Sequence, residues 1–109
     1  MSMPPSTGPW VKELQASIVR SLLQQVCVAN KSAAGFWVWI CDSAAGAAVQ
    51  SDLCPHYVAP NERQVFDFAP APRLMVSGVY VGASTGAAAF VAIAADDCYI
   101  EVAYQPFPL

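Results

Sequence analysis

The sequence carries little charge, and only a small part of that charge is basic. Of its 109 residues 12% are charged, against roughly 25% in an average soluble domain, and 56% are hydrophobic. Five Lys and Arg against eight Asp and Glu leave a net charge of -3, which argues against nucleic acid as a partner because a nucleic-acid groove needs a basic stripe. A single domain of this length has much to bury and few charges to cover its surface. We therefore expect another chain to cover part of its apolar surface.

Hydrophobic runs long enough to cross a membrane are also missing. The apolar segment A-A-A-F-V-A-I-A-A at 87–95 is far shorter than the ~18 residues that a membrane helix needs. Residues 1–10 have neither a basic start nor an apolar core, so the sequence predicts no secretory signal. We expect synthesis in the cytoplasm and no membrane partner.

Cysteine pairs at metal-binding or redox spacing are absent as well. The four cysteines are Cys27, Cys41, Cys54 and Cys98, and none of them forms a C-x-x-C motif. Two disulfides in any of three connectivities stay open. In a chain without a secretion signal the pattern favours buried free thiols. Cys54 and His56, in C-P-H, lack a second pair of ligands, so they indicate a turn beside a strand rather than a metal site.

The sequence offers little material for catalysis, because it contains one histidine. A triad of Ser84, His56 and Asp67 has no G-x-S-x-G elbow to support it. Asp96-Asp97 is typical of a solvated turn, since calcium needs six or more oxygen ligands. G-A-S-T-G at 82–86 lacks the lysine of a phosphate-binding loop. We predict no catalytic residue, no cofactor and no metal.

What the sequence does contain is a series of short apolar or alternating runs separated by Gly, Pro, Asn and Asp. They predict strands over 19–30, 36–41, 63–68, 74–76, 78–84 and 98–104, with a further one over 87–94. Leu14, Ile18 and Leu22 recur at helical spacing, so a short helix or coil is predicted over 11–18.

These elements predict an all-β fold, an antiparallel β-sandwich or jelly-roll-like single domain of seven or eight short strands. Proline-rich ends cannot be helical and have little to bury. The expected organisation is an N-terminal arm over 1–18, the sandwich domain over 19–104 and an extended tail over 105–109.

The segment F-W-V-W-I-C at 36–41 poses a particular problem, because side chains alternate between the two faces of a strand and both faces here are apolar. One face is expected in the core. We interpret the face of Trp37 and Trp39 as a subunit contact, since tryptophan is enriched at interfaces. The alternative is that the N-terminal arm or residues 44–60 of the same chain fold over these tryptophans.

A resemblance rests on the order of several short motifs. These are V-C-V-A-N, F-W-V-W-I-C-D-S-A, Y-V-A-P, V-F-D-F, G-V-Y-V-G-A-S-T and D-D-C-Y-I-E-V-A-Y-Q, over roughly residues 22 to 105. The shared features are a strand ending at Asn30, Asp42 with Ala44, a turn at 59–60, and a strand that begins at Gly78 and runs into Ser84-Thr85. In this order the chain resembles small β-sandwich structural proteins of tailed bacteriophages.

The resemblance implies a non-enzymatic virion protein of the capsid decoration (cement) type or of the head- or tail-fibre type. A decoration protein binds the major capsid protein, sits on the capsid surface and is commonly a homotrimer. On this hypothesis the contacts with other copies or with the capsid involve Trp10, Trp37, Trp39, Phe107 and Leu109.

Two other functions remain open. One is a fibre or lectin-like module for host surface glycans, because exposed aromatics beside polar groups suit sugars. The residues available for it are Tyr57, Tyr80, Tyr99, Tyr104, Asn61, Asp96 and Asp97. The other is a small hydrolase, which the single histidine disfavours.

Overall fold

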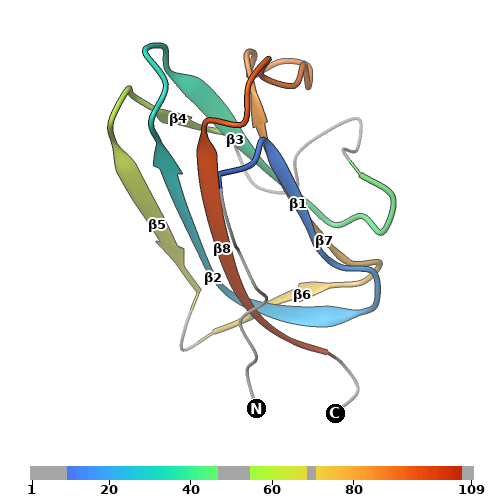
Figure 1. The fold of residues 1–109 in the computed structure, drawn as a ribbon. Coiled ribbons are helices and arrows are strands. Elements are labelled where there is room, and N and C mark those ends of the chain that lie inside the picture. Colours follow the sequence, from blue (N-terminus) through green and yellow to red (C-terminus); the bar gives the residue numbers. More distant parts are fainter. Residues whose placement is uncertain (1–9, 47–54, 69–70, 107–109) are drawn as a thin grey trace.

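The computed structural model describes residues 10–46, 55–68 and 71–106, which form eight β-strands and no helix. The strands are β1 (Glu13–Ser17), β2 (Ser21–Asn30), β3 (Phe36–Cys41), β4 (His56–Val58), β5 (Arg63–Asp67), β6 (Arg73–Met75), β7 (Val79–Ser84) and β8 (Cys98–Pro106). They lie in two layers that face each other (Figure 1). The predicted all-β sandwich is confirmed.

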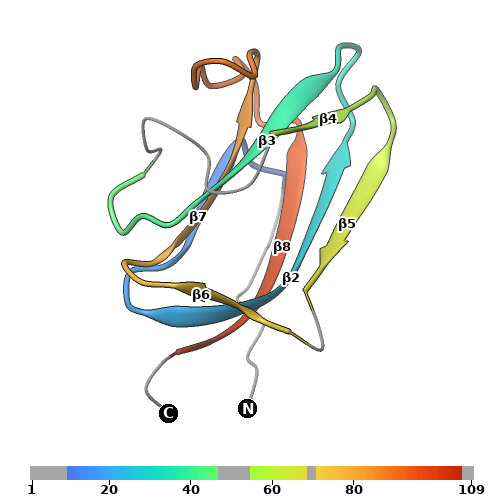
Figure 2. The same ribbon diagram turned by 180° about the vertical axis from the view of Figure 1, so that it is seen from behind.

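Each layer is an antiparallel sheet of four strands. Sheet I has the order β1-β7-β3-β4. Sheet II is built around the long strand β2, which pairs with β8 along its length. The other edge of β2 is shared, because β5 pairs with 25–29 and β6 with 21–23. The view from behind shows β5 and β6 following one another along β2 (Figure 2).

The main core fills the space between the sheets. Val26 and Val28 of β2 face inward from sheet II, and Val38 and Val81 face them from sheet I; all four are at most 2% exposed. A two-way backbone bridge between Val11 and Cys98 (2.6 and 2.8 Å) connects the segment before β1 to β8 and so joins the two sheets at one side.

The short helix expected over 11–18 is wrong, because this segment forms β1. Leu14 pairs with Val81 and packs against the core, while Glu13 and Gln15 pair with residues on the outer face of β7. A helix of two turns is marginal in isolation. Pairing with the edge of β7 therefore overrides the helical spacing.

The expected strand over 87–94 is also wrong. Only an isolated bridge, between Ser84 and Ala92, forms there. The run is rich in alanine, which favours strands weakly. Instead it folds back across sheet I. At the other end, β8 continues to Pro106, so the first two residues of the expected tail belong to the sheet.

A buried asparagine holds the β2–β3 and β4–β5 connections together. Asn30 is 2% exposed. Its amide nitrogen donates to the carbonyl oxygens of Ala34 (3.0 Å), Val58 (3.1 Å) and Ala59 (3.3 Å). Its side-chain oxygen accepts from the Ser32 N–H at 2.8 Å. One side chain therefore satisfies polar groups from two loops.

Replacing this residue tests that role. Asn30→Ala leaves buried carbonyls without a donor and should lower the free energy of unfolding by about 2–3 kcal/mol. Urea denaturation measures the change. Gln25→Ala, an exposed substitution in the same strand, is the control and should stay within about 0.5 kcal/mol. Equal effects of the two variants would contradict the assignment.

Candidate functional site

The outer face of sheet I carries the aromatic residues that the sequence singles out. The register places Trp39 opposite Gly82 and Cys41 opposite Tyr80 on this face. Trp39 is 1% exposed, Cys41 is 0% exposed and Tyr80 is 2% exposed, so they form a second cluster outside the main core. The expectation that another subunit covers Trp39 is wrong, since the chain buries this side chain itself.

Phe90 provides that cover. Its ring meets Trp39 edge to face at 5.6 Å and Tyr80 at 6.0 Å. It lies over Gly82, where a Cβ atom would come within 2.9 Å of the ring. The indole N–H of Trp39 donates to the Gly86 carbonyl at 3.0 Å. The covering segment thus follows β7, whereas the sequence alternative named the N-terminal arm or residues 44–60.

The Ser84 hydroxyl fixes this covering segment to the end of β7. Ser84 is fully buried. Its oxygen accepts from the N–H groups of Gly86 (3.1 Å) and Val91 (3.0 Å) and donates to the Gly86 carbonyl (2.9 Å). The base of the loop is therefore held by side-chain bonds as well as by the Phe90 contact.

The other aromatic residues of the expected interface lie in different environments. Trp37 is half-buried and meets Tyr57 of β4 edge to face at 5.4 Å; Tyr57 is 50% exposed. Trp10 packs edge to face on Tyr99 at 5.6 Å, with the Lys31 ammonium 4.9 Å from a Trp10 ring. Their role as contacts stays a prediction. Phe107 and Leu109 lie outside the described residues.

Exposed hydrophobic residues gather at one end of the sandwich. Ile18 (68%) and Val19 (50%) lie in the β1–β2 turn, while Leu74 (47%) and Val76 (62%) lie on and beside β6. The two groups are adjacent, because the Ser17 carbonyl lies close to the backbone of Gly78. A Cβ atom added at Gly78 would come within 2.5 Å of the Ser17 carbonyl oxygen. We call these four residues the apolar end.

The turns that carry the apolar end are held by polar side chains. The Ser17 and Ser21 hydroxyl oxygens lie 2.8 Å apart, and each also lies within hydrogen-bond distance of the Val19 carbonyl oxygen (3.1 and 2.9 Å), so that their two protons serve these three contacts. The Asp42 carboxylate accepts from the N–H groups of Val76 (2.8 Å), Ser77 (2.6 Å) and Gly78 (3.3 Å). Bonds to a charged acceptor are stronger than neutral ones, so the apolar side chains stand on a fixed backbone.

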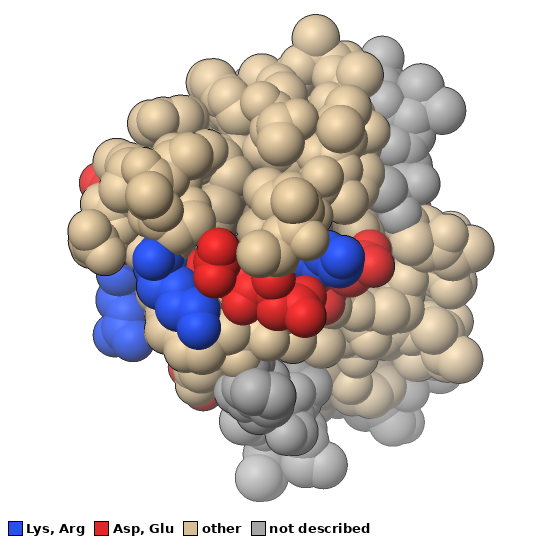
Figure 3. All heavy atoms as spheres, turned by 45° about the horizontal axis from the view of Figure 1, so that its top comes forward, with Lys and Arg blue, Asp and Glu red and all other residues tan. Residues whose placement is uncertain are grey.

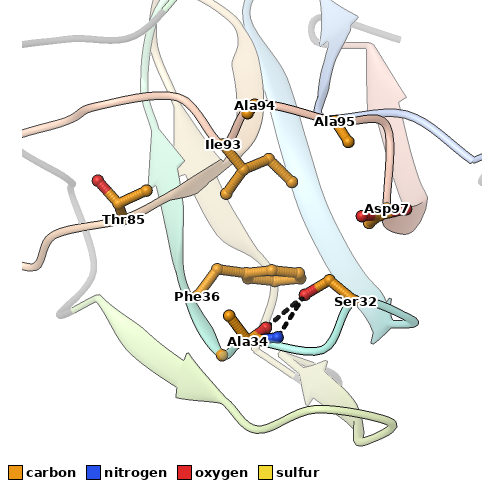
Figure 4. A pocket seen from close by; sticks show the side chains of 9 residues that line it. Ser32, Ala34, Phe36, Thr85, Ile93, Ala94, Ala95 and Asp97 are labelled. Carbon is orange, nitrogen blue, oxygen red and sulfur yellow. Dashed lines mark hydrogen bonds between the residues drawn. The ribbon is translucent and has the colours of Figure 1, made fainter.

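A pocket of about 230 Å³ lies at the opposite end, between the β2–β3 loop and the segment after β7. Its lining consists of Ser32, Ala34, Gly35, Phe36, Thr85, Ile93, Ala94, Ala95 and Asp97. Figure 4 shows Phe36 and Ile93 as its apolar walls, with Ser32 bonded to Ala34 at one side and Asp97 at the rim. The space-filling view toward this end shows acidic side chains gathered in its middle and basic ones on both sides (Figure 3).

The structure does not bring Ser84, His56 and Asp67 together as a catalytic triad. Ser84 pairs with Trp37 on the outer face of sheet I, and its hydroxyl is engaged by the loop. His56 pairs with Val38, which faces the core, and meets Phe66 of sheet II edge to face at 4.8 Å. Histidine and serine therefore lie on opposite faces of the same sheet.

The cysteines and acidic residues in the part of the chain that the structure describes form no further reactive or metal-binding cluster. There Cys27, Cys41 and Cys98 are buried and belong to no disulfide, as predicted, and no three metal-ligating side chains come together. Burial raises the pKa of the Cys98 thiol to about 12. Cys54 lies outside the described residues. Within the described ranges no helix is long and apolar enough to cross a membrane.

The sequence analysis missed the apolar end. The available signal was the pair Ile18-Val19 between Ser17 and Arg20, since two adjacent large apolar residues are unusual in a turn. The prediction of a short helix or coil over residues 11–18 hid that anomaly. Leu74 and Val76 flank the buried Met75, and their alternation would have placed them on the outer side of a strand.

The Phe90 cover can be tested by adding a single methyl group. Gly82→Ala should displace Phe90, lower the free energy of unfolding by about 1–3 kcal/mol and speed hydrogen exchange of the Trp39 indole N–H. In the double variant Gly82→Ala/Phe90→Ala the total loss should be smaller than the sum of the two separate losses, because the clash with Phe90 is gone while the approach of the new Cβ atom to the Tyr80 hydroxyl (2.7 Å) remains. Val91→Ser, an exposed change in the same loop, is the control. Strict additivity would contradict the proposed contact.

The Tyr80 phenol gives a pH-dependent prediction. Burial, and then a 2.5 Å hydrogen bond to Glu13 together with its charge, raise the pKa of Tyr80 well above its usual value of 10.0. Because the folded-state pKa is raised, the stability that the Tyr80 phenol contributes is complete below pH 10. This contribution falls as the pH rises above 10, because only the unfolded phenol then ionises. The stability of wild type should therefore decline relative to Tyr80→Phe above pH 10, by at most about 1.4 kcal/mol per pH unit. Denaturation series from pH 8 to 11 on both proteins measure this difference. Parallel curves of the free energy of unfolding against pH would refute the prediction.

The comparisons with known proteins support the fold and leave the family open. No protein-family model matches the sequence, and no curated protein matches it. Among solved structures, the fold is similar to that of the coat protein of Tobacco streak virus, with a TM-score of 0.50 and 8% sequence identity. The match covers 100% of this chain and 88% of that one. At this identity the likeness shows a shared β-sandwich arrangement.

Proposed function

We propose that the chain is a non-enzymatic virion structural protein, a capsid decoration protein of a tailed bacteriophage that binds the shell of the major capsid protein. One observation carries this proposal: a rigid sandwich with few charges leaves large hydrophobic side chains exposed in fixed positions. Ile18, Tyr57 and Val76 are each at least 50% exposed. Such surfaces are characteristic of interaction sites.

Two further findings favour a structural role. The fold is similar to that of a viral coat protein, and the described residues hold neither an assembled triad nor a metal-ligating cluster. A decoration protein needs a stable fold and contact surfaces rather than a reactive group. Each contact that it makes buries apolar area at ~25 cal/mol per Å² before entropic losses. Repetition over a closed shell increases the total effect.

The proposed shell contact lies on the outer face of sheet I beside the edge strand β4, where Trp37 and Tyr57 form an aromatic pair. Aromatic side chains supply much of the binding energy of interfaces. Trp10 and the terminal residues Phe107 and Leu109 are further contacts in this proposal. The protein would be made in the host cytoplasm and would act as a homotrimer on the capsid surface.

The second candidate is a fibre or lectin-like module that recognises host glycans. The observation that favours it is the pair of the half-buried Trp37 and the exposed Tyr57, since aromatic faces stack on sugar rings. The other expected residues are not gathered around this pair. Tyr80 is buried under Phe90, Tyr99 is engaged by Trp10, and Asp97 lines the pocket between the loops. For this reason we rank it below shell binding.

A matched pair of tryptophan substitutions tests the proposal. Trp37→Ser should leave a folded protein whose affinity for undecorated shells of the major capsid protein falls at least about tenfold. Trp39→Ser, in the same strand and on the same face, removes a buried side chain and should instead lower the free energy of unfolding by about 3–5 kcal/mol. Co-sedimentation with the shells and chemical denaturation separate the two effects.

The control is Val65→Ser, which changes an exposed residue on sheet II. A wild-type protein that fails to bind shells but binds a defined sugar on a glycan array would replace the proposal by the second candidate. Turnover in a broad esterase and glycosidase assay would refute both.

A further inference from the structure

The sandwich has two ends with complementary properties. β2 runs from Ser21, beside the apolar end, to Asn30, beside the pocket, and β7 runs in the same way from Val79 to Ser84. Figure 1 accordingly shows β6 and the β1–β2 turn at one end and the loops after β2 and β7 at the other. One end presents protruding side chains, and the other presents a hollow.

We propose that the apolar end of one copy docks into the pocket of a second copy, so that the chain assembles head to tail. This inference rests on the proposed function only in assuming a homo-oligomer, and it names the two surfaces that form the contact. Ile18, the most exposed of the large hydrophobic residues, enters the pocket, and Val76 packs on its rim.

The size and chemistry of the pocket suit this occupant. A cavity of about 150 Å³ lined by apolar side chains holds a benzene-sized ligand. The pocket, at about 230 Å³, is large enough for one isoleucine side chain, and Phe36 and Ile93 give it apolar walls. Ile18 stands on a turn fixed by the Ser17 and Ser21 hydroxyls, so little conformational freedom is lost on docking.

The charges around the two surfaces are complementary as well. Arg20 follows the Ile18-Val19 turn and Arg73 begins β6, and both are exposed. Asp42 also lies beside this end, and its carboxylate accepts from three backbone N–H groups. The pocket carries Asp97 at its rim, and Asp96 precedes it in the sequence. In the head-to-tail arrangement the two arginines approach Asp97 of the next copy, whereas docking of two apolar ends would bring the arginines of both copies together.

Symmetry gives the same arrangement a clear consequence. A twofold dimer uses one surface twice, whereas a cyclic trimer requires two different surfaces on every subunit. The apolar end and the pocket are two such surfaces on one chain. A head-to-tail contact closes into a ring when its rotation permits and otherwise continues as a filament.

The test uses one variant for each surface. Ile18→Ser/Val76→Ser removes the protruding side chains and keeps the pocket; Ala94→Phe fills the pocket and keeps the apolar end. Wild-type protein should form a concentration-dependent or closed oligomer. The dissociation constant of each variant alone should be at least about tenfold higher than that of wild type, so that the variant is monomeric at concentrations at which wild type assembles. Val65→Ser is the matched control and should assemble as wild type does.

Mixing the two variants gives the decisive result. Each retains one intact surface, so an equimolar mixture should form a 1:1 dimer and nothing larger in sedimentation velocity. Circular dichroism of each variant verifies its fold, and Ala95→Lys replaces Ala94→Phe if the latter does not fold. The inference is overturned by a monomeric wild type at every concentration, by variants that assemble like wild type, or by a mixture that stays monomeric.

These outcomes are separate from those of the shell experiment. Variants that still assemble, together with Trp37-dependent shell binding, would refute the head-to-tail contact and leave the proposed function intact. A 1:1 dimer in the mixture without any shell binding would refute the proposed function and leave the contact intact.

Discussion

The packing of Phe90 over Gly82 is the contact on which the rest of the molecule depends. Sheet I is apolar on both faces, and only its inner face meets sheet II. The absence of a side chain at residue 82 leaves room for the Phe90 ring, which covers Trp39 and Tyr80 on the outer face. The fold is therefore a sandwich with a local third layer supplied by a loop. The chain itself covers most of the apolar outer face of sheet I.

This cover determines where apolar surface remains. With the middle of sheet I closed, the large hydrophobic residues that are exposed among the described ones lie at the edge beside β4, at single positions such as Val65 and Val91, and in the two turns of the apolar end. Those turns are held by the hydroxyl groups of Ser17 and Ser21 and by the Asp42 carboxylate. Side chains on such a fixed backbone are suited to a contact, whereas apolar residues on a loosely held turn would lose more entropy on binding.

Much of this architecture is predictable from the sequence, because alternation and turn residues are local signals. The strand over 36–41 and its two apolar faces follow from the sequence letters alone. The cover over Trp39 does not, since nothing local relates Phe90 to Gly82. The helical spacing of Leu14 and Ile18 was misleading for the same reason: the open edge of β7 that makes 13–17 a strand lies more than sixty residues away. The candidate contact residues show the same division: aromatic character marked Trp37, but the apolar end emerges only when two distant turns meet.

The scarcity of charge gives the two ends their separate importance. A surface with so few charges has little electrostatic repulsion to prevent unspecific association, so the placement of each charge matters. The arginines beside the apolar end disfavour contact between two such ends more than they strengthen any single contact. Apolar area then supplies affinity, and the few charges supply direction. A low-charge sandwich whose two ends differ in this way can associate with itself in one orientation. It then keeps the aromatic edge of sheet I for a different partner.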